Sequence, residues 1–156
     1  MRLLAIDPGN EESALLVYDT DTGLPEKWAK LPNDQGARLW MDFAECDSLA
    51  IEMVASYGMA VGASVFETCV WAGRFIERWI LRSKGSWQPL YRREIKLHIC
   101  GSARAKDANI RQALIDRYGG KQQAVGLKKT PGPLYGMSVD CWSALAVAVT
   151  VADRTP

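Results

Sequence analysis

The sequence is poor in the side chains that build disulfide frameworks and zinc centres. Its 156 residues include a single histidine, His98, and four cysteines. No two cysteines form a Cys-x-x-Cys pair, and they stand at Cys46, Cys69, Cys100 and Cys141. This spacing argues against a zinc cluster and favours buried, reduced thiols in a cytosolic protein.

Long apolar segments are also missing. Charged side chains interrupt every apolar run well before the about 18 residues that a membrane span needs. The chain opens with Met1-Arg2 and a short apolar run that ends at Asp7, which does not resemble a signal peptide. We therefore expect a cytoplasmic protein with no membrane partner.

The composition nevertheless supplies enough apolar material for a core. Hydrophobic residues make up 48% of the chain and charged residues 24%. These values exclude a disordered chain and a small scaffold that depends on disulfides. The length suits one globular domain, which we expect to span residues 1–156.

The sequence also has almost no net charge. The total of +1 by itself argues against a nucleic-acid partner, yet it hides net charges of −8 over residues 1–73, +10 over 74–129 and −1 over 130–156. Such asymmetry within one domain indicates an anionic partner, although scattered basic residues can also form a merely solvated surface. The candidate phosphate contacts are Arg74, Arg78, Arg92, Arg93, Arg104, Lys121, Lys128 and Lys129.

Apolar patterning predicts three strands followed by alternating strands and helices. The expected strands span residues 3–6, 13–18, 27–31, 48–54 and 87–91, and the first three form an antiparallel meander. The expected helices span residues 35–43, 60–81, 107–118 and 139–152, and residues 119–133 form a loop. This order predicts an α/β fold with a mixed five-stranded sheet and helices on both faces.

Three carboxylates occupy positions where the surrounding sequence predicts burial. Asp7 ends the first strand, Glu52 lies inside the fourth, and Asp140 opens the last helix. Buried charges are rare unless they are paired or bind metal. If the first and fourth strands are neighbours, the three carboxylates meet at one edge of the sheet. Oxygen ligands of this kind suit Mg²⁺ or Mn²⁺, and two such ions can promote phosphodiester hydrolysis.

Two of these carboxylates also have ordinary structural explanations. Asp7 precedes Pro8-Gly9 and could be a turn residue, while Asp140 could be favoured by the dipole at a helix N-terminus. Glu52 is the strongest candidate for a functional role, because no residue near it in the strand would neutralise its charge.

Taken in order along the chain, these motifs resemble those of the RuvC-type Holliday-junction resolvases, and most closely phage or prophage members. The motifs are Asp7-Pro8-Gly9 after an apolar strand, Ile51-Glu52 in another strand, and Asp140-x-x-Ser143 at a terminal helix. The resemblance covers nearly the whole chain. It implies a ribonuclease-H-like fold and a nuclease with two Mg²⁺ ions per site, or Mn²⁺ in their place, held by the three carboxylates.

The resemblance also extends to two lysines. Lys96, in the segment Ile95-Lys96-Leu97, and Lys106, at the start of the following helix, match positions that lie near the scissile phosphate in the family. A lysine there can offset phosphate charge or help to orient water. An ordinary solvated lysine is the alternative for each.

In two places the sequence departs from the family pattern. Bacterial members often carry a second carboxylate on the last helix where this chain has Ser143, so the fourth metal ligand could be Ser143 or Asp107. For Asp107, an exposed charge at a helix start is the favoured explanation. Some members insert an aromatic side chain into the junction, and the nearest candidate here is Tyr57, because Ala55 stands three positions after Glu52.

The helix expected over residues 60–81 has an apolar stripe wider than packing on a sheet requires. We expect this helix to form a two-fold homodimer interface, as the family's does, which suits the two symmetric strands of a four-way junction. The predicted function is Mg²⁺-dependent, paired cleavage of Holliday or other branched DNA junctions in a prokaryotic or phage-infected cell. The alternatives are a junction-binding protein with weak or no cleavage, and a ribonuclease-H-type enzyme that cuts RNA–DNA hybrids.

Overall fold

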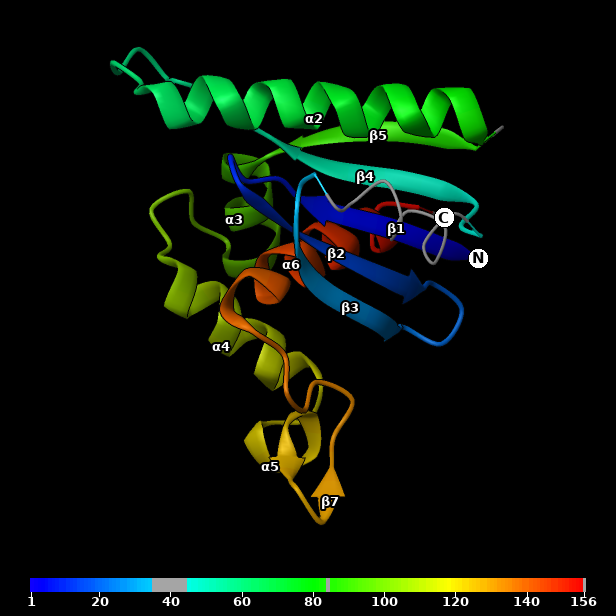
Figure 1. Cartoon of the computed structure of the whole chain (residues 1–156). Coiled ribbons are helices and arrows are strands. Elements are labelled where there is room, and N and C mark those ends of the chain that lie inside the picture. Colours follow the sequence, from blue (N-terminus) through cyan, green and yellow to red (C-terminus); the bar gives the residue numbers. More distant parts are fainter. Residues whose placement is uncertain (35–44, 84, 156) are drawn as a thin grey trace.

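A mixed five-stranded sheet forms the centre of the computed structural model, which describes residues 1–34, 45–83 and 85–155 (Figure 1). The spatial order of the strands is β3-β2-β1-β4-β5. Their bounds are β1 Arg2–Asp7, β2 Glu12–Asp19, β3 Leu24–Pro32, β4 Ser48–Met53 and β5 Ser86–Tyr91. The predicted sheet is therefore confirmed, with each strand within a few residues of its expected place.

Strand pairing sets the position of the first two candidate carboxylates. β1 pairs antiparallel with β2, and β2 with β3, which confirms the meander. β4 pairs parallel with β1 and β5 parallel with β4. The register aligns Ile6 with Ile51, so the residues that follow them, Asp7 and Glu52, reach the same edge of the sheet. Residues 3–6 and 49–51 are fully buried because helices cover both faces here.

Helices cover both faces of the sheet, as predicted. Figure 1 shows α2 on one face and α3 and α6 on the other. The helices are α2 Ala63–Arg82, α3 Arg92–Cys100, α4 Asp107–Arg117, α5 Lys121–Ala124 and α6 Val139–Ala152. Most of α6 is buried against β1 and β2, which explains why its sequence is apolar all round. In α2, only Ala72, Phe75 and Trp79 are buried, on the side that faces the sheet.

Two segments differ from the sequence prediction, and a third cannot be compared. Residues 119–133, expected to be a loop, contain α5 and a small hairpin of β6 (Gly126–Leu127) and β7 (Thr130–Pro131) at the opposite end of the molecule from α2 (Figure 1). Residues 92–100, where no helix was expected, form α3, which ends at Gly101 in a left-handed conformation. The helix expected over residues 35–43 lies outside the described residues.

Within the described parts of the chain, no helix is both long enough and apolar enough to cross a bilayer.

The contribution of α6 to the core can be tested by measuring the free energy of unfolding of variants. Leu145→Ala should lower the free energy of unfolding by about 2–5 kcal/mol, because Leu145 is fully buried and the change leaves a cavity. Leu127→Ala makes the same chemical change at a side chain that is 73% exposed and should cost under about 0.5 kcal/mol. Urea denaturation followed by circular dichroism measures both. Equal effects of the two changes would contradict this description of the core.

Candidate active site

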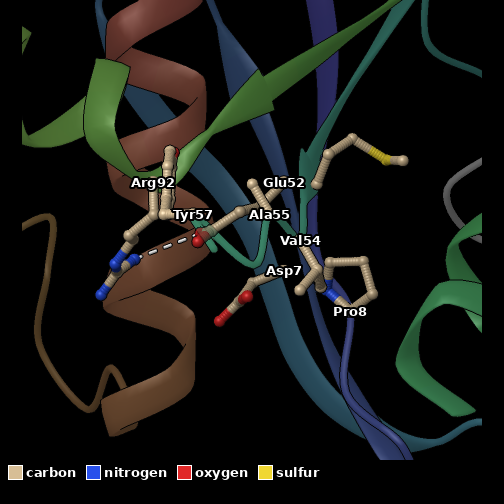
Figure 2. Close-up of a pocket in the computed structure, with 8 residues that line it drawn as sticks. Asp7, Pro8, Glu52, Val54, Ala55, Tyr57 and Arg92 are labelled. Atoms are coloured by element: carbon tan, nitrogen blue, oxygen red, sulfur yellow. Dashed lines mark hydrogen bonds and ion pairs between the residues drawn. The ribbon is translucent and has the colours of Figure 1, made fainter. Parts of the chain in front are cut away.

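Asp7 and Glu52 share a pocket at the carboxyl ends of β1 and β4. The pocket has a volume of about 170 Å³ and is also lined by Tyr57 and Arg92. Figure 2 shows the two carboxylates on neighbouring strands, with Arg92 beside Glu52. The parallel pairing of β1 with β4 therefore brings two of the three predicted carboxylates together.

The surroundings of Asp7 disfavour its charged form. The pKa of Asp7 is raised to about 7, first by burial and then by the nearby charges of Glu52 and Asp140, while Arg92 and Ser143 act in the opposite direction. Near neutral pH, Asp7 is therefore divided between its protonated and charged forms. A bound cation would favour the charged form.

Glu52 has a counter-ion that the sequence analysis did not find. Burial raises the pKa of Glu52, and Arg92 opposes that effect. The Nη1 of Arg92 donates a hydrogen bond to the Oε2 of Glu52 at 3.2 Å, and its Nη2 donates another to Asp107. Arg92 follows Glu52 by 40 residues and reaches it only because β4 and β5 are paired. The sequence analysis found no partner for Glu52 within its own strand, and the partner that the structure provides comes from another element.

Asp140 lies near the pair but is not buried, contrary to expectation. Its side chain is 44% exposed, because the first turn of α6 projects beyond the core and burial begins at Cys141. The Nζ of Lys30 on β3 lies 2.7 Å from the Oδ2 of Asp140 and 3.0 Å from Glu12. Asp140 thus acts on Asp7 through its charge while its own carboxylate is paired with Lys30.

The two candidates for a fourth ligand differ in their surroundings. Ser143 lies close enough to Asp7 to oppose the rise in the pKa of Asp7. The side chain of Asp107 is 76% exposed at the start of α4 and pairs with Arg92. The expected exposed position of Asp107 is therefore confirmed, and Ser143 is the candidate close to the carboxylate pair.

A divalent metal fits the chemistry of this site in part. Across residues 1–34, 45–83 and 85–155, no group of three or more histidine, cysteine, aspartate or glutamate side chains is arranged to hold an ion. The two carboxylates that share the pocket nevertheless offer only oxygen donors, which are the ligands that hard divalent cations prefer. Asp7 and Glu52 suit Mg²⁺ or Mn²⁺, and Asp140 could join them if its ion pair with Lys30 opens.

The predicted lysines lie on the side of the site nearest α3 and α4. Lys96, on α3, lines a neighbouring pocket with Arg93 and Tyr57, and its charge acts on Glu52. Lys106 is exposed at the N-terminal end of α4 and lines neither of these two pockets. Lys96 is therefore the better placed of the two.

Tyr57 stands in the connection between β4 and α2 with its side chain 58% exposed. Its φ of 47° is uncommon for a residue other than glycine, asparagine or aspartate. Tyr57 lines both the carboxylate pocket and the pocket beside Lys96. This places an aromatic ring beside the carboxylates.

The remaining basic candidates are spread over several surfaces. Because β4 and β5 both run toward the carboxylate edge, α2 between them runs back, and it carries Arg74 and Arg78 away from the pocket. Arg104 is exposed between α3 and α4. Lys121 begins α5, and Lys128 and Lys129 form the turn between β6 and β7. These residues do not gather around Asp7 and Glu52.

An antiparallel meander extended by two parallel strands, with carboxylates where β1 and β4 end, defines a ribonuclease-H-like fold. Two solved structures share this architecture: RuvC of Thermus thermophilus, with a TM-score of 0.64, and T. thermophilus RuvC in complex with a Holliday junction substrate, with a TM-score of 0.66. In both cases the identity is 16%, and the match covers 96% of this chain and 92% of the other. No protein-family model and no curated protein sequence matches the chain. At this identity the likeness establishes the fold.

The environment of Asp7 predicts a dependence of stability on pH. The pKa of Asp7 rises from an ordinary value of 3.8 to about 7, so the folded protein binds the proton more tightly than the unfolded chain does. The contribution of Asp7 therefore lowers stability progressively as pH rises from about 4 to about 7, and the loss is complete above that range. Asp7→Asn removes this penalty and should stabilise the metal-free protein by about 2–4 kcal/mol more at pH 8 than at pH 4.5.

Urea unfolding in the presence of EDTA at both pH values measures this difference. Asp116→Asn, an exposed aspartate on α4, is the control and should change stability by less than about 0.5 kcal/mol at either pH. The same Asp7→Asn effect at both pH values would show that Asp7 is not strained by burial.

Proposed function

We propose that this protein is a metal-dependent endonuclease that resolves four-way or other branched DNA junctions by paired hydrolysis of opposed strands. The observation that carries the proposal is the pair of partly buried carboxylates, Asp7 and Glu52, at one edge of adjacent parallel strands. The fold supports it, because T. thermophilus RuvC shares this fold and has been solved with a Holliday junction substrate.

Asp7 and Glu52 would hold Mg²⁺ or Mn²⁺, two ions per site, together with Asp140. The bound ions would supply Lewis-acid stabilisation of the attacking and leaving oxygens of the phosphodiester. Ser143, which lies near Asp7, is the proposed fourth ligand in place of Asp107. Lys96, and Lys106 at the edge of the site, would offset phosphate charge.

Branched DNA would contact the exposed basic residues around and beyond the site. Arg93 lies beside Lys96, Arg104 follows α3, and three lysines, Lys121, Lys128 and Lys129, extend the basic surface to the hairpin. Salt-dependent phosphate contacts suit such dispersed charges, and Arg74 and Arg78 could extend them along α2. Tyr57, exposed beside the carboxylates, would stack on a base at the branch point.

The outer face of α2 is the proposed homodimer interface. Four large apolar side chains on this helix are more than half exposed, and they are Phe66, Val70, Ile80 and Leu81. An apolar surface of this kind on a soluble protein indicates an interaction site. A two-fold dimer would give two active sites related by symmetry, which matches the two strands that resolution must cut.

Replacing Glu52 tests the proposed activity. Glu52→Gln should lower the rate of junction cleavage in Mg²⁺ by at least about a hundredfold, because an amide is a poor ligand for the ion that stabilises the transition state. Affinity for the junction in Ca²⁺ should stay within about threefold of wild type, since most binding comes from phosphate contacts. Gel assays with a labelled four-way junction measure both quantities.

The matched control is Glu45→Gln, an exposed glutamate three residues before the start of β4, which should cleave like wild type. Residual cutting by Glu52→Gln within a few-fold of wild type would show that the carboxylates are misassigned. Wild-type protein that binds the junction in Mg²⁺ and Mn²⁺ without nicking it would favour the junction-binding alternative. Cleavage of RNA–DNA hybrids without junction preference would favour the ribonuclease-H-type alternative.

The dimer can be tested separately. Val70→Arg should shift the protein from dimer to monomer in sedimentation velocity at micromolar concentration, because it places a charge in the middle of the apolar face of α2. Gln112→Arg, on the exposed face of α4, adds the same side chain elsewhere and should remain dimeric. A wild-type protein that sediments as a monomer would overturn the dimer proposal.

A further inference from the structure

Arg92 occupies an unusual place in the candidate site. It is the first residue of α3, immediately after the end of β5, and its side chain is only 25% exposed. One side of the guanidinium contacts Glu52, whose side chain is 15% exposed, and the other contacts Asp107 at the surface. Arg92 therefore connects the interior of the site to its rim.

The contact between Arg92 and Glu52 differs from the other ion pair in the site. Lys30 and Asp140 have side chains that are 39% and 44% exposed, so water can replace either partner at little cost. Glu52 is largely shielded from water, and its charge would be poorly compensated without Arg92. Arg92 thus stabilises Glu52 in the protein as it stands in the structure.

This arrangement conflicts with the use of Glu52 as a metal ligand. The Oε2 of Glu52 already accepts a hydrogen bond from Arg92, so a cation that used this oxygen would compete with Arg92 for it. A divalent cation anywhere on the same carboxylate would be repelled by the guanidinium, and the repulsion is strong where water is largely excluded. Binding of one positive charge at Glu52 therefore disfavours binding of the other.

Arg92 has a place to which it can move. Its second contact, with Asp107, is at the surface and does not depend on Glu52. Arg92 also lines the neighbouring pocket of about 370 Å³ with Arg93 and Lys96, the basic side of the site. A guanidinium released from Glu52 could remain on Asp107 and face that pocket, where a phosphate would favour it.

We propose that Arg92 is an internal counter-ion that holds Glu52 in the metal-free protein and releases it when a divalent cation binds. The inference rests on the proposed function, since it takes Glu52 as a metal ligand. Arg92 then acts as a positioning residue that lowers the affinity of the site for free metal. Once released from Glu52, Arg92 would be free to contact a DNA phosphate, as the sequence analysis predicts for this residue.

The test measures Mn²⁺ affinity by the electron paramagnetic resonance signal of the free ion, with full-length protein and no DNA. Arg92→Gln keeps a hydrogen-bond donor near Glu52 but removes the charge, and it should bind Mn²⁺ about tenfold more tightly than wild type or better. Arg93→Gln removes the neighbouring arginine, which lines the other pocket, and should stay within about twofold of wild type. Glu52→Gln should weaken binding and so identifies the site.

A thermal readout separates competition from a simple loss of stability. In EDTA, Arg92→Gln should melt at a lower temperature than wild type, because Glu52 loses its partner. Saturating Mn²⁺ should then raise its melting temperature by more than it raises that of wild type. A purely structural role for Arg92 predicts the lower melting temperature but an unchanged Mn²⁺ affinity.

Each outcome decides the inference. Unchanged or weaker Mn²⁺ binding by Arg92→Gln overturns it and leaves the proposed nuclease function intact. If Arg92→Gln does not fold, Arg92→Met decides, because methionine removes the positive charge and keeps an unbranched side chain that can pack against its neighbours. That variant should also bind Mn²⁺ about tenfold more tightly than wild type, and an unchanged affinity overturns the inference. Absence of Mn²⁺ binding by wild type and every variant overturns both the inference and the metal chemistry of the proposed function.

Discussion

The parallel pairing of β1 with β4 is the constraint on which the site depends. It fixes the backbone positions of Asp7 and Glu52 side by side, at an edge where the strand residues that precede them are fully buried. Two carboxylates in such a position repel each other and are poorly hydrated. The structure answers this constraint with Arg92 from α3, with Ser143 from α6, and with partial protonation of Asp7. The helices around the sheet edge therefore supply side chains that interact with the carboxylates, in addition to packing against the sheet.

Charge balance links the site to the proposed partner. The negative segment of the chain forms β1 to β4 and supplies Asp7 and Glu52, whereas the positive segment begins within α2 and continues through the turn of the hairpin. At the site the two segments meet through Arg92, so positive charge from the second half of the chain neutralises part of the first. Basic residues not used in this way remain exposed on α3, on α5 and in the hairpin turn. A polyanion that approached the carboxylate pocket from this side would meet positive charge first.

Local patterns were reliable where a segment is buried on both sides or packs by a single face. The bounds of α6 were predicted without error and the start of α4 was correct, because a continuous apolar run and a capped amphipathic helix have clear signatures. The helix α3 was missed because it follows β5 without a connecting turn and has a single fully buried residue, Ile95. The hairpin was missed because each of its strands has two residues, which is too short for an alternating pattern.

The sequence by itself determined that the protein is an α/β fold with a mixed sheet, and it identified Asp7 and Glu52 as carboxylates in buried strands. Both conclusions follow from neighbours within a few residues, where periodicity and side-chain type carry the information. The tertiary structure alone decided which basic side chains pair with the carboxylates of the site. Arg92 approaches Glu52 from 40 residues away, and Lys30 approaches Asp140 from the edge strand β3. Ion pairs of this range depend on strand order and helix placement, and no local pattern in the sequence encodes them.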